Sequence, residues 1–156
     1  MDKRAVNAMA VSATLHCLTG CAIGEVLGMI IGTAANLSNG ATIALSIVLA
    51  FVFGFGLSAM PLVKAGIGLA AALSLVAAAD TLSIATMEVA DNLVIVAIPG
   101  ALHAGLTDLL FWASLLISLV AAFLVALPVN RYLLQRNKGH AITMKALSDR
   151  GHGHHH

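Results

Sequence analysis

The sequence predicts an all-α fold, an integral membrane bundle of about four transmembrane helices, from its composition and its pattern of apolar runs. Hydrophobic residues make up 60% of the 156 positions, charged residues make up 10%, and the mean hydropathy is +0.97. Soluble domains carry roughly 25% charged residues, so this chain cannot cover its surface with polar side chains. The long apolar runs between polar turns make the lipid bilayer its expected environment.

The first expected span covers residues 9–34 and is followed by a polar turn at residues 36–40. The second covers residues 41–60, which contain no charged side chain. Pro61 is expected to end it, because proline lacks the backbone N–H that a helix interior uses. Each run has the length of about 20 residues that a helix needs to cross the hydrocarbon core.

The third expected span covers residues 69–98 and stops at Pro99. The fourth covers residues 109–127 and is expected to end at Pro128, by the same argument as for the second span. Together the spans form one membrane helical domain, residues 1–139. A polar tail, residues 140–156, follows it, and its histidines fit part of a purification tag and a native metal-binding tail equally well.

Basic residues predict the orientation of the bundle. None of the eight lysines and arginines lies in the first or third connection; they are Lys3, Arg4, Lys64, Arg131, Arg136, Lys138, Lys145 and Arg150. Four spans would place all of them on one side, which the positive-inside rule makes cytoplasmic. We therefore expect both termini on the cytoplasmic side of the membrane. A formal net charge of only +1 argues against nucleic acid as a partner.

Candidate metal ligands gather on the first span. Cys17, Cys21 and Glu25 are four residues apart, so they share one helical face, and His16 adjoins them. Two cysteines this close in an apolar run do not make a disulfide framework, and a reduced thiol pair is expected. Thiolate and thioether ligands select Cu(I). With Met87 from the third span, they predict a soft-cation binding or transport site, with a copper ion as the candidate cofactor.

The third span carries acidic residues that lipid would not tolerate. Asp80 and Asp91 share a face with Met87, and Glu88 and Asn92 lie beside them. A charged side chain at the bilayer centre costs about 2.5–3.5 kcal/mol or more, and no basic residue lies inside an expected span to neutralise it. These four polar residues define the second hypothesis, a pathway for protons or cations in a channel or carrier.

A repeat of glycines on the first span predicts close helix packing. Residues four apart with small side chains allow two helices to approach closely. We expect the first and third spans to meet across this glycine ladder, which brings the thiols toward the acids. The ladder also predicts a homo-oligomer, and it supports a third hypothesis, a structural or assembly subunit. It consists of Gly20, Gly24, Gly28 and Gly32.

Two motifs carry a family resemblance. The run from His16 to Glu25, with its two cysteines and two glycines, and the run from Asp80 to Asn92 resemble those of a family of bacterial and archaeal membrane proteins. That family is described only as a domain of unknown function. The resemblance implies a small multi-span helical membrane domain in the inner membrane of a prokaryotic cell, and it implies no particular activity.

No enzymatic activity is predicted. The sequence has no Walker-type phosphate-binding loop, and no serine, histidine and acid trio occurs in an evident catalytic context. Structural roles stay open for the candidate residues, because buried cysteine and methionine often only fill a core. A hydrogen-bonded network of protonated acids is a further alternative.

Overall fold

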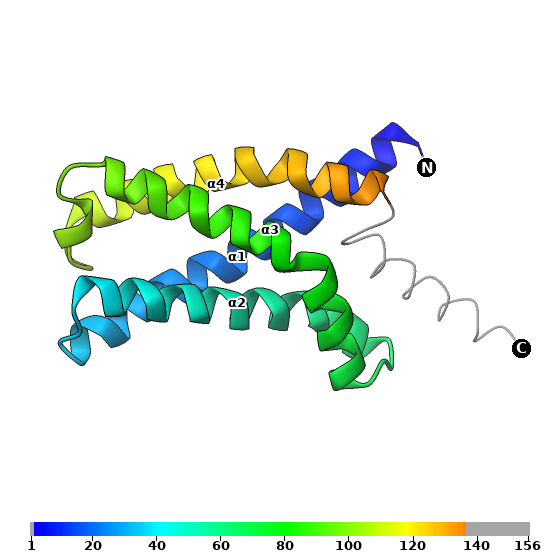
Figure 1. Ribbon diagram of the computed structural model, residues 1–156, viewed down its shortest axis with the longest axis horizontal. Coiled ribbons are helices and arrows are strands. Elements are labelled where there is room, and N and C mark those ends of the chain that lie inside the picture. Colours follow the sequence, from blue (N-terminus) through cyan, green and yellow to red (C-terminus); the bar gives the residue numbers. More distant parts are fainter. Residues whose placement is uncertain (1, 137–156) are drawn as a thin grey trace, which may run out of the picture.

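The computed structural model describes residues 2–136, which form four long α-helices, one short 3-10 helix and no strand (Figure 1). The all-α prediction is therefore confirmed for this part of the chain. The expected tail at residues 140–156 lies outside it. The elements are α1 (Lys3–Ala34), α2 (Asn39–Lys64), α3 (Leu69–Ala97), η1 (Ala101–His103) and α4 (Leu109–Gln135).

Three of the helices within residues 2–136, α1, α2 and α4, are long and apolar enough to cross a membrane. Their outward faces expose large aliphatic side chains, such as Val52 of α2 and Leu116 and Leu124 of α4. In water such surfaces would drive aggregation, whereas acyl chains solvate them without cost. The chain is a membrane protein.

The helix α3 is bent, which the sequence analysis did not predict. Its segments Leu69–Ala78 and Asp80–Ala97 meet at an angle of 56°, so α3 qualifies as a membrane span only if the two are counted together. Figure 1 shows the first segment turning away from the rest of the helix. No proline or glycine lies in α3. The Thr81 hydroxyl donates to the carbonyl oxygen of Ala77 across the bend, and such back-bonding bends helices.

Two of the expected helix ends are wrong. Pro61 and Pro128 lie inside α2 and α4, which continue beyond them. A proline removes one backbone hydrogen bond, but tertiary packing can compensate. In α4 the segment after the proline buries Leu134 against Val6 and Ala10 of α1. This contact holds the last turns of α4 in helical conformation.

The glycine ladder of α1 packs against α2, and the expectation that it meets the third span is wrong. Each glycine faces a small residue of α2 in an antiparallel register. A Cβ atom on Gly20 would lie only 2.5 Å from the Cα atom of Gly54. Since α2 occupies the ladder, a second copy of the chain cannot dock there. The facing pairs are Gly20 with Gly54, Gly24 with Ala50, Gly28 with Ser46 and Gly32 with Thr42.

The connections fall at two ends of the bundle (Figure 1). One end holds the start of α1, the turn between α2 and α3 and the end of α4. The opposite end holds the turn between α1 and α2 and the connection that contains η1. The candidate site described next opens toward this second end.

Candidate functional site

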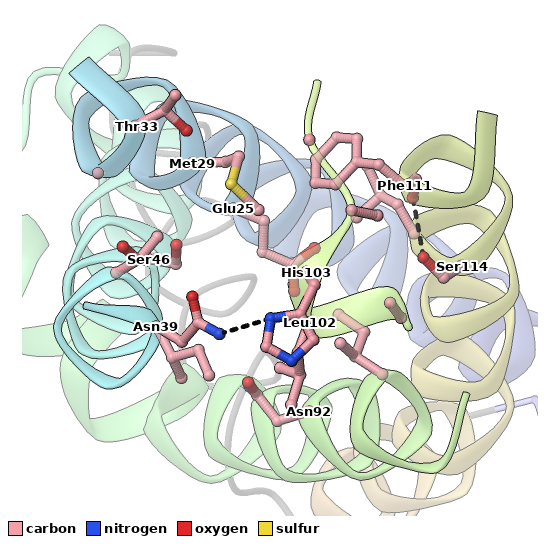
Figure 2. Close-up of a pocket in the computed structure, with 18 of the residues that line it drawn as sticks. Glu25, Met29, Thr33, Asn39, Ser46, Asn92, Leu102, His103, Phe111 and Ser114 are labelled. Carbon is pink, nitrogen blue, oxygen red and sulfur yellow. Dashed lines mark hydrogen bonds between the residues drawn. The ribbon is translucent and has the colours of Figure 1, made fainter. Parts of the chain in front are cut away.

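A cavity of about 360 Å³ lies between α1, α2, α3 and the start of α4, beneath the connection that contains η1. Polar side chains from every side line it. Glu25 reaches in from α1, Ser46 from α2 and Asn92 from α3, as Figure 2 shows. A hollow of this size with polar side chains in its wall has room for water.

Side chains around η1 fix the outer boundary of the cavity. His103 of η1 points toward α2, where Asn39 Nδ2 lies 3.4 Å from His103 Nδ1 (Figure 2). The backbone N–H of Gly105 donates to Asp108 Oδ2 at 2.7 Å. Trp112 Nε1 donates to the carbonyl oxygen of Leu106 at 2.8 Å. These contacts hold the connection in place over the cavity.

Three carboxyl groups converge on the cavity: Glu25, Glu88 and Asp91. The carboxyl groups of Glu25 and Asp91 lie close together, and the charge of Glu88 acts on this pair. Both carboxyl oxygens of Glu88 and of Asp91, and Oε2 of Glu25, are buried without a hydrogen-bond partner among the residues that the structure describes. Burying an ionised carboxylate without a partner is costly. This acid cluster therefore calls for water, protons or a bound cation.

A sulfur cluster lies next to the acids. Cys17, Cys21 and Met87 belong to one buried core cluster, and their side chains are 1%, 2% and 0% exposed. Both thiols are free. The structure thus brings the two cysteines of α1 and the methionine of α3 together, although the glycine ladder packs elsewhere. Sulfur-bearing side chains from two helices are thus buried in the same part of the core.

Glu88 connects the two clusters. Its side chain lines the cavity, and it also adjoins the thiol of Cys21. Further along α1, Cys17 lies near Asp80. Polar and sulfur groups therefore follow one another from the cavity into the protein, along the surface where α1 meets α3.

His16 does not join this site. Its side chain is exposed, and Nδ1 interacts with the carbonyl oxygen of Ser12 on its own helix at 2.7 Å. The hypothesis that His16 assists a metal at the thiols is contradicted by this position. Within residues 2–136, no three side chains of histidine, cysteine, aspartate and glutamate are arranged to hold one metal ion together.

Asn92 and Asp80 are the two other residues predicted for a proton or cation pathway. They lie at opposite ends of the row of polar and sulfur groups between α1 and α3. Asn92 is partly buried at the cavity and donates from Nδ2 to the carbonyl oxygen of Glu88 at 2.8 Å. Asp80 is 2% exposed, does not line the cavity and lies at the bend of α3. The acids of α3 are thus distributed along the helix.

Comparison with known proteins gives a family. The family model described as Domain of unknown function (DUF4396) matches residues 6–139. The chain belongs to this family. The matched range includes every candidate residue of this DUF4396 chain, and it supports the resemblance seen in the two motifs at the level of a domain of unknown function. No curated protein and no solved structure matches it.

The contribution of α2 to the site of this DUF4396 member was not predicted from its sequence. Asn39 and Thr42 line the cavity, and Ser58 adjoins Cys17. A signal was present, because small residues recur every four positions along α2. They mirror the glycine ladder and identify α2 as its partner. This stripe consists of Thr42, Ser46, Ala50, Gly54 and Ser58.

Proposed function

We propose that the protein binds and transfers a soft monovalent cation, specifically Cu(I), within a prokaryotic inner membrane. The position of Glu88 carries the proposal, because this residue lines the cavity and adjoins Cys21. A cation attracted to the acid cluster would therefore be separated from the soft ligand Cys21 only by the side chain of Glu88. The acids supply the attraction, and the sulfur cluster supplies the selectivity.

The chemistry of the ligands fits this ion. Thiolate and thioether groups bind Cu(I) in preference to hard cations. Cys17, Cys21 and Met87 offer two thiols and one thioether inside one buried cluster. Cu(I) needs few ligands and no octahedral shell, so the lack of a larger group of acids and histidines in the described residues does not count against it.

The proposed topology counts the bent helix α3 as a fourth span. The start of α1, the turn between α2 and α3 and the end of α4 then lie on the cytoplasmic side, where the described basic residues gather. The cavity faces the opposite side, so the cation enters from outside the cytoplasm. The described basic residues at the cytoplasmic end are Lys3, Arg4, Lys64, Arg131 and Arg136.

Metal titration tests the proposal directly. The full chain, with the histidines at positions 152 and 154–156 replaced by serine, is titrated with Cu(I) against a chromophoric chelator. We expect one ion per chain, with affinity reduced by at least about tenfold in Cys17→Ser and in Cys21→Ser, because each loses a soft ligand. Ser118→Ala is the matched control, since Ser118 is buried in α4 outside the cluster. Unchanged affinity in both cysteine variants would contradict the proposal.

A second function is supported by a different observation. Glu25, Glu88 and Asp91 line the cavity, whereas neither cysteine does. The acids alone can form a pathway for protons or hard cations. Proton flux into liposomes that contain the Cys17→Ser/Cys21→Ser double variant tests this function. Flux that persists there and is lost in Asp91→Asn would favour it over soft-cation transfer.

The third hypothesis, an assembly subunit that docks through the glycine ladder, loses its basis because α2 covers the ladder. A homo-oligomer stays a proposal and would have to use another face of the bundle. Chemical crosslinking in native membranes would show whether copies of the chain associate.

A further inference from the structure

The cavity is larger than a metal ion needs, and its acids are not arranged for one. A water molecule takes up about 30 Å³, whereas the cavity measures about 360 Å³. Small-molecule pockets begin at about 300 Å³. Glu25, Glu88 and Asp91 line the cavity, yet within residues 2–136 no three acids, histidines or cysteines are arranged to hold one metal ion. A ligand of several atoms can reach carboxyl groups that a single metal ion cannot reach together.

Asp91 indicates that this ligand carries positive charge. Its side chain lines the cavity, is 2% exposed, and receives no hydrogen bond at either carboxyl oxygen from a donor in the described residues. The carboxyl group of Glu25 lies close by. A proton shared by these two acids would serve one oxygen of Asp91 and leave the other without a donor. No lysine or arginine of residues 2–136 lines the cavity, so the described basic side chains do not neutralise the acids there.

The side of the cavity toward α4 is mainly apolar. Ala104, Phe111 and Leu115 form a buried cluster there, and Met29 of α1 packs against it. All four line the cavity. Figure 2 shows Met29 and Phe111 on the side opposite Asn92. Apolar walls with a few convergent polar groups are typical of sites for small organic molecules. The cavity therefore suits a ligand that has a charged head and a hydrocarbon part.

We propose that the cavity binds a small primary ammonium ion on a short hydrocarbon chain. The ammonium group lies at Asp91 and Glu25, and the hydrocarbon chain lies against Met29 and Phe111. A primary ammonium group has three N–H donors, as lysine has. These donors can serve several carboxyl oxygens at once, and the positive charge offsets the burial of the acids.

Other organic cations fit less well. A quaternary ammonium ion has no N–H donor and is usually held by a cage of aromatic rings. Among the phenylalanine, tyrosine and tryptophan residues of positions 2–136, Phe111 alone lines the cavity. The second charge of a short diamine would lie against the apolar wall, where an unpaired charge is costly. The site goes beyond the proposed transfer of Cu(I) and does not rest on it, because neither Cys17 nor Cys21 lines the cavity.

Thermal unfolding of the full-length chain in detergent tests the proposal. Tm is measured at pH 7 in butylammonium, methylammonium, tetramethylammonium and sodium chloride at equal ionic strength. We expect a saturable rise of Tm with butylammonium over sodium, because a ligand that binds only the folded state stabilises it. Butylammonium should bind about fourfold tighter than methylammonium for each methylene group that it buries. Equal Tm in butylammonium and sodium, or a larger rise with tetramethylammonium, would overturn the proposal.

Variants test the two parts of the site separately. Asp91→Asn and Glu25→Gln are each expected to weaken the apparent affinity for butylammonium about tenfold, since each loses one negative charge. Asp2→Asn is the matched control, because Asp2 is exposed and does not line the cavity. Met29→Gln is expected to weaken butylammonium binding and to leave methylammonium binding unchanged. A wild-type response to butylammonium in both acid variants would refute the site.

The Cys17→Ser/Cys21→Ser double variant keeps this proposal apart from the soft-cation function. It is expected to lose Cu(I) affinity and to keep its response to butylammonium, because both thiols lie outside the cavity lining. A butylammonium response in a wild-type chain that never binds Cu(I) would sink the soft-cation function and leave the ammonium site standing. Loss of the response in a folded double variant would contradict a separate ammonium site.

Discussion

The face of α1 that packs against α2 and the face that meets α3 bury different kinds of group. The first is lined by the glycine ladder, which lets backbone atoms of α2 approach closely. The second carries Cys17, Cys21 and Glu25, next to the acids of α3. Helix association in membranes depends on van der Waals packing and small residues. The tight interface stabilises the bundle, and the polar interface can then hold groups that cost free energy in a membrane.

Overpacking the tight face is the most disruptive change that we predict. Gly24→Leu would force a side chain into the backbone of Ala50, and we expect a loss of about 3 kcal/mol of stability. Size-exclusion profiles and Tm in detergent measure it. Gly56→Ala is the control, because a Cβ atom there meets open space. If Gly24→Leu folds with wild-type Tm, the close contact between α1 and α2 is wrong.

A change on the polar face should affect transfer and leave folding intact. Glu88→Gln removes one charge from the cavity wall without changing its shape. We expect uptake of Cu(I) into proteoliposomes to fall about tenfold, since the acid that links the cavity to Cys21 has lost its attraction for cations. Asp2→Asn makes the same charge change at an exposed side chain before α1, outside the cavity lining. Equal uptake by the two variants would remove Glu88 from the pathway.

Helical periodicity accounts for what the sequence predicted of the two faces. Cys17 and Cys21 share a face because they are one turn apart on the same helix, and this relation is local. Which helix covers the glycine ladder is a nonlocal question. The answer depends on the complementary stripe of small residues on α2, which includes Ala50 and Gly54. The glycine ladder of α1, considered alone, does not indicate that α2 is its partner. Long apolar spans and charge asymmetry predicted membrane helices, but not how they pair.

Two other features lay beyond the sequence analysis for physical reasons. The bend of α3 has no proline or glycine to mark it, and it coincides with the back-bonding of Thr81, a residue common in straight helices too. Ser58 lies in α2, whose sequence is mostly apolar, and only the folding of the chain brings it close to Cys17. Both features concern the surroundings of Cys17, since Asp80 at the bend and Ser58 of α2 act on its thiol.

Loss of the thioether on the polar face should have a moderate effect. Met87→Leu keeps the volume of this fully buried side chain, so we expect less than about 1.5 kcal/mol of destabilisation. The affinity for Cu(I) should fall about fivefold, which corresponds to about 1 kcal/mol. Chelator competition measures the affinity, and Met60→Leu on the exposed surface of α2 is the control. Identical Cu(I) affinities in the two variants would mean that the two thiols alone bind Cu(I), without the thioether of Met87.

The smallest effect is expected at His16, and it tests how α1 is divided into faces. Neighbouring residues on a helix are about 100° apart, so a side chain next to Cys17 in sequence points away from it. His16 is exposed and interacts with its own backbone at Ser12. His16→Ala should therefore change the Cu(I) affinity less than about twofold and the stability less than about 0.5 kcal/mol. If this variant weakens Cu(I) binding as strongly as Cys17→Ser, then α1 is rotated relative to the arrangement described above. The glycines would then no longer face α2, and the separation of a packing face from a chemical face would fail with them.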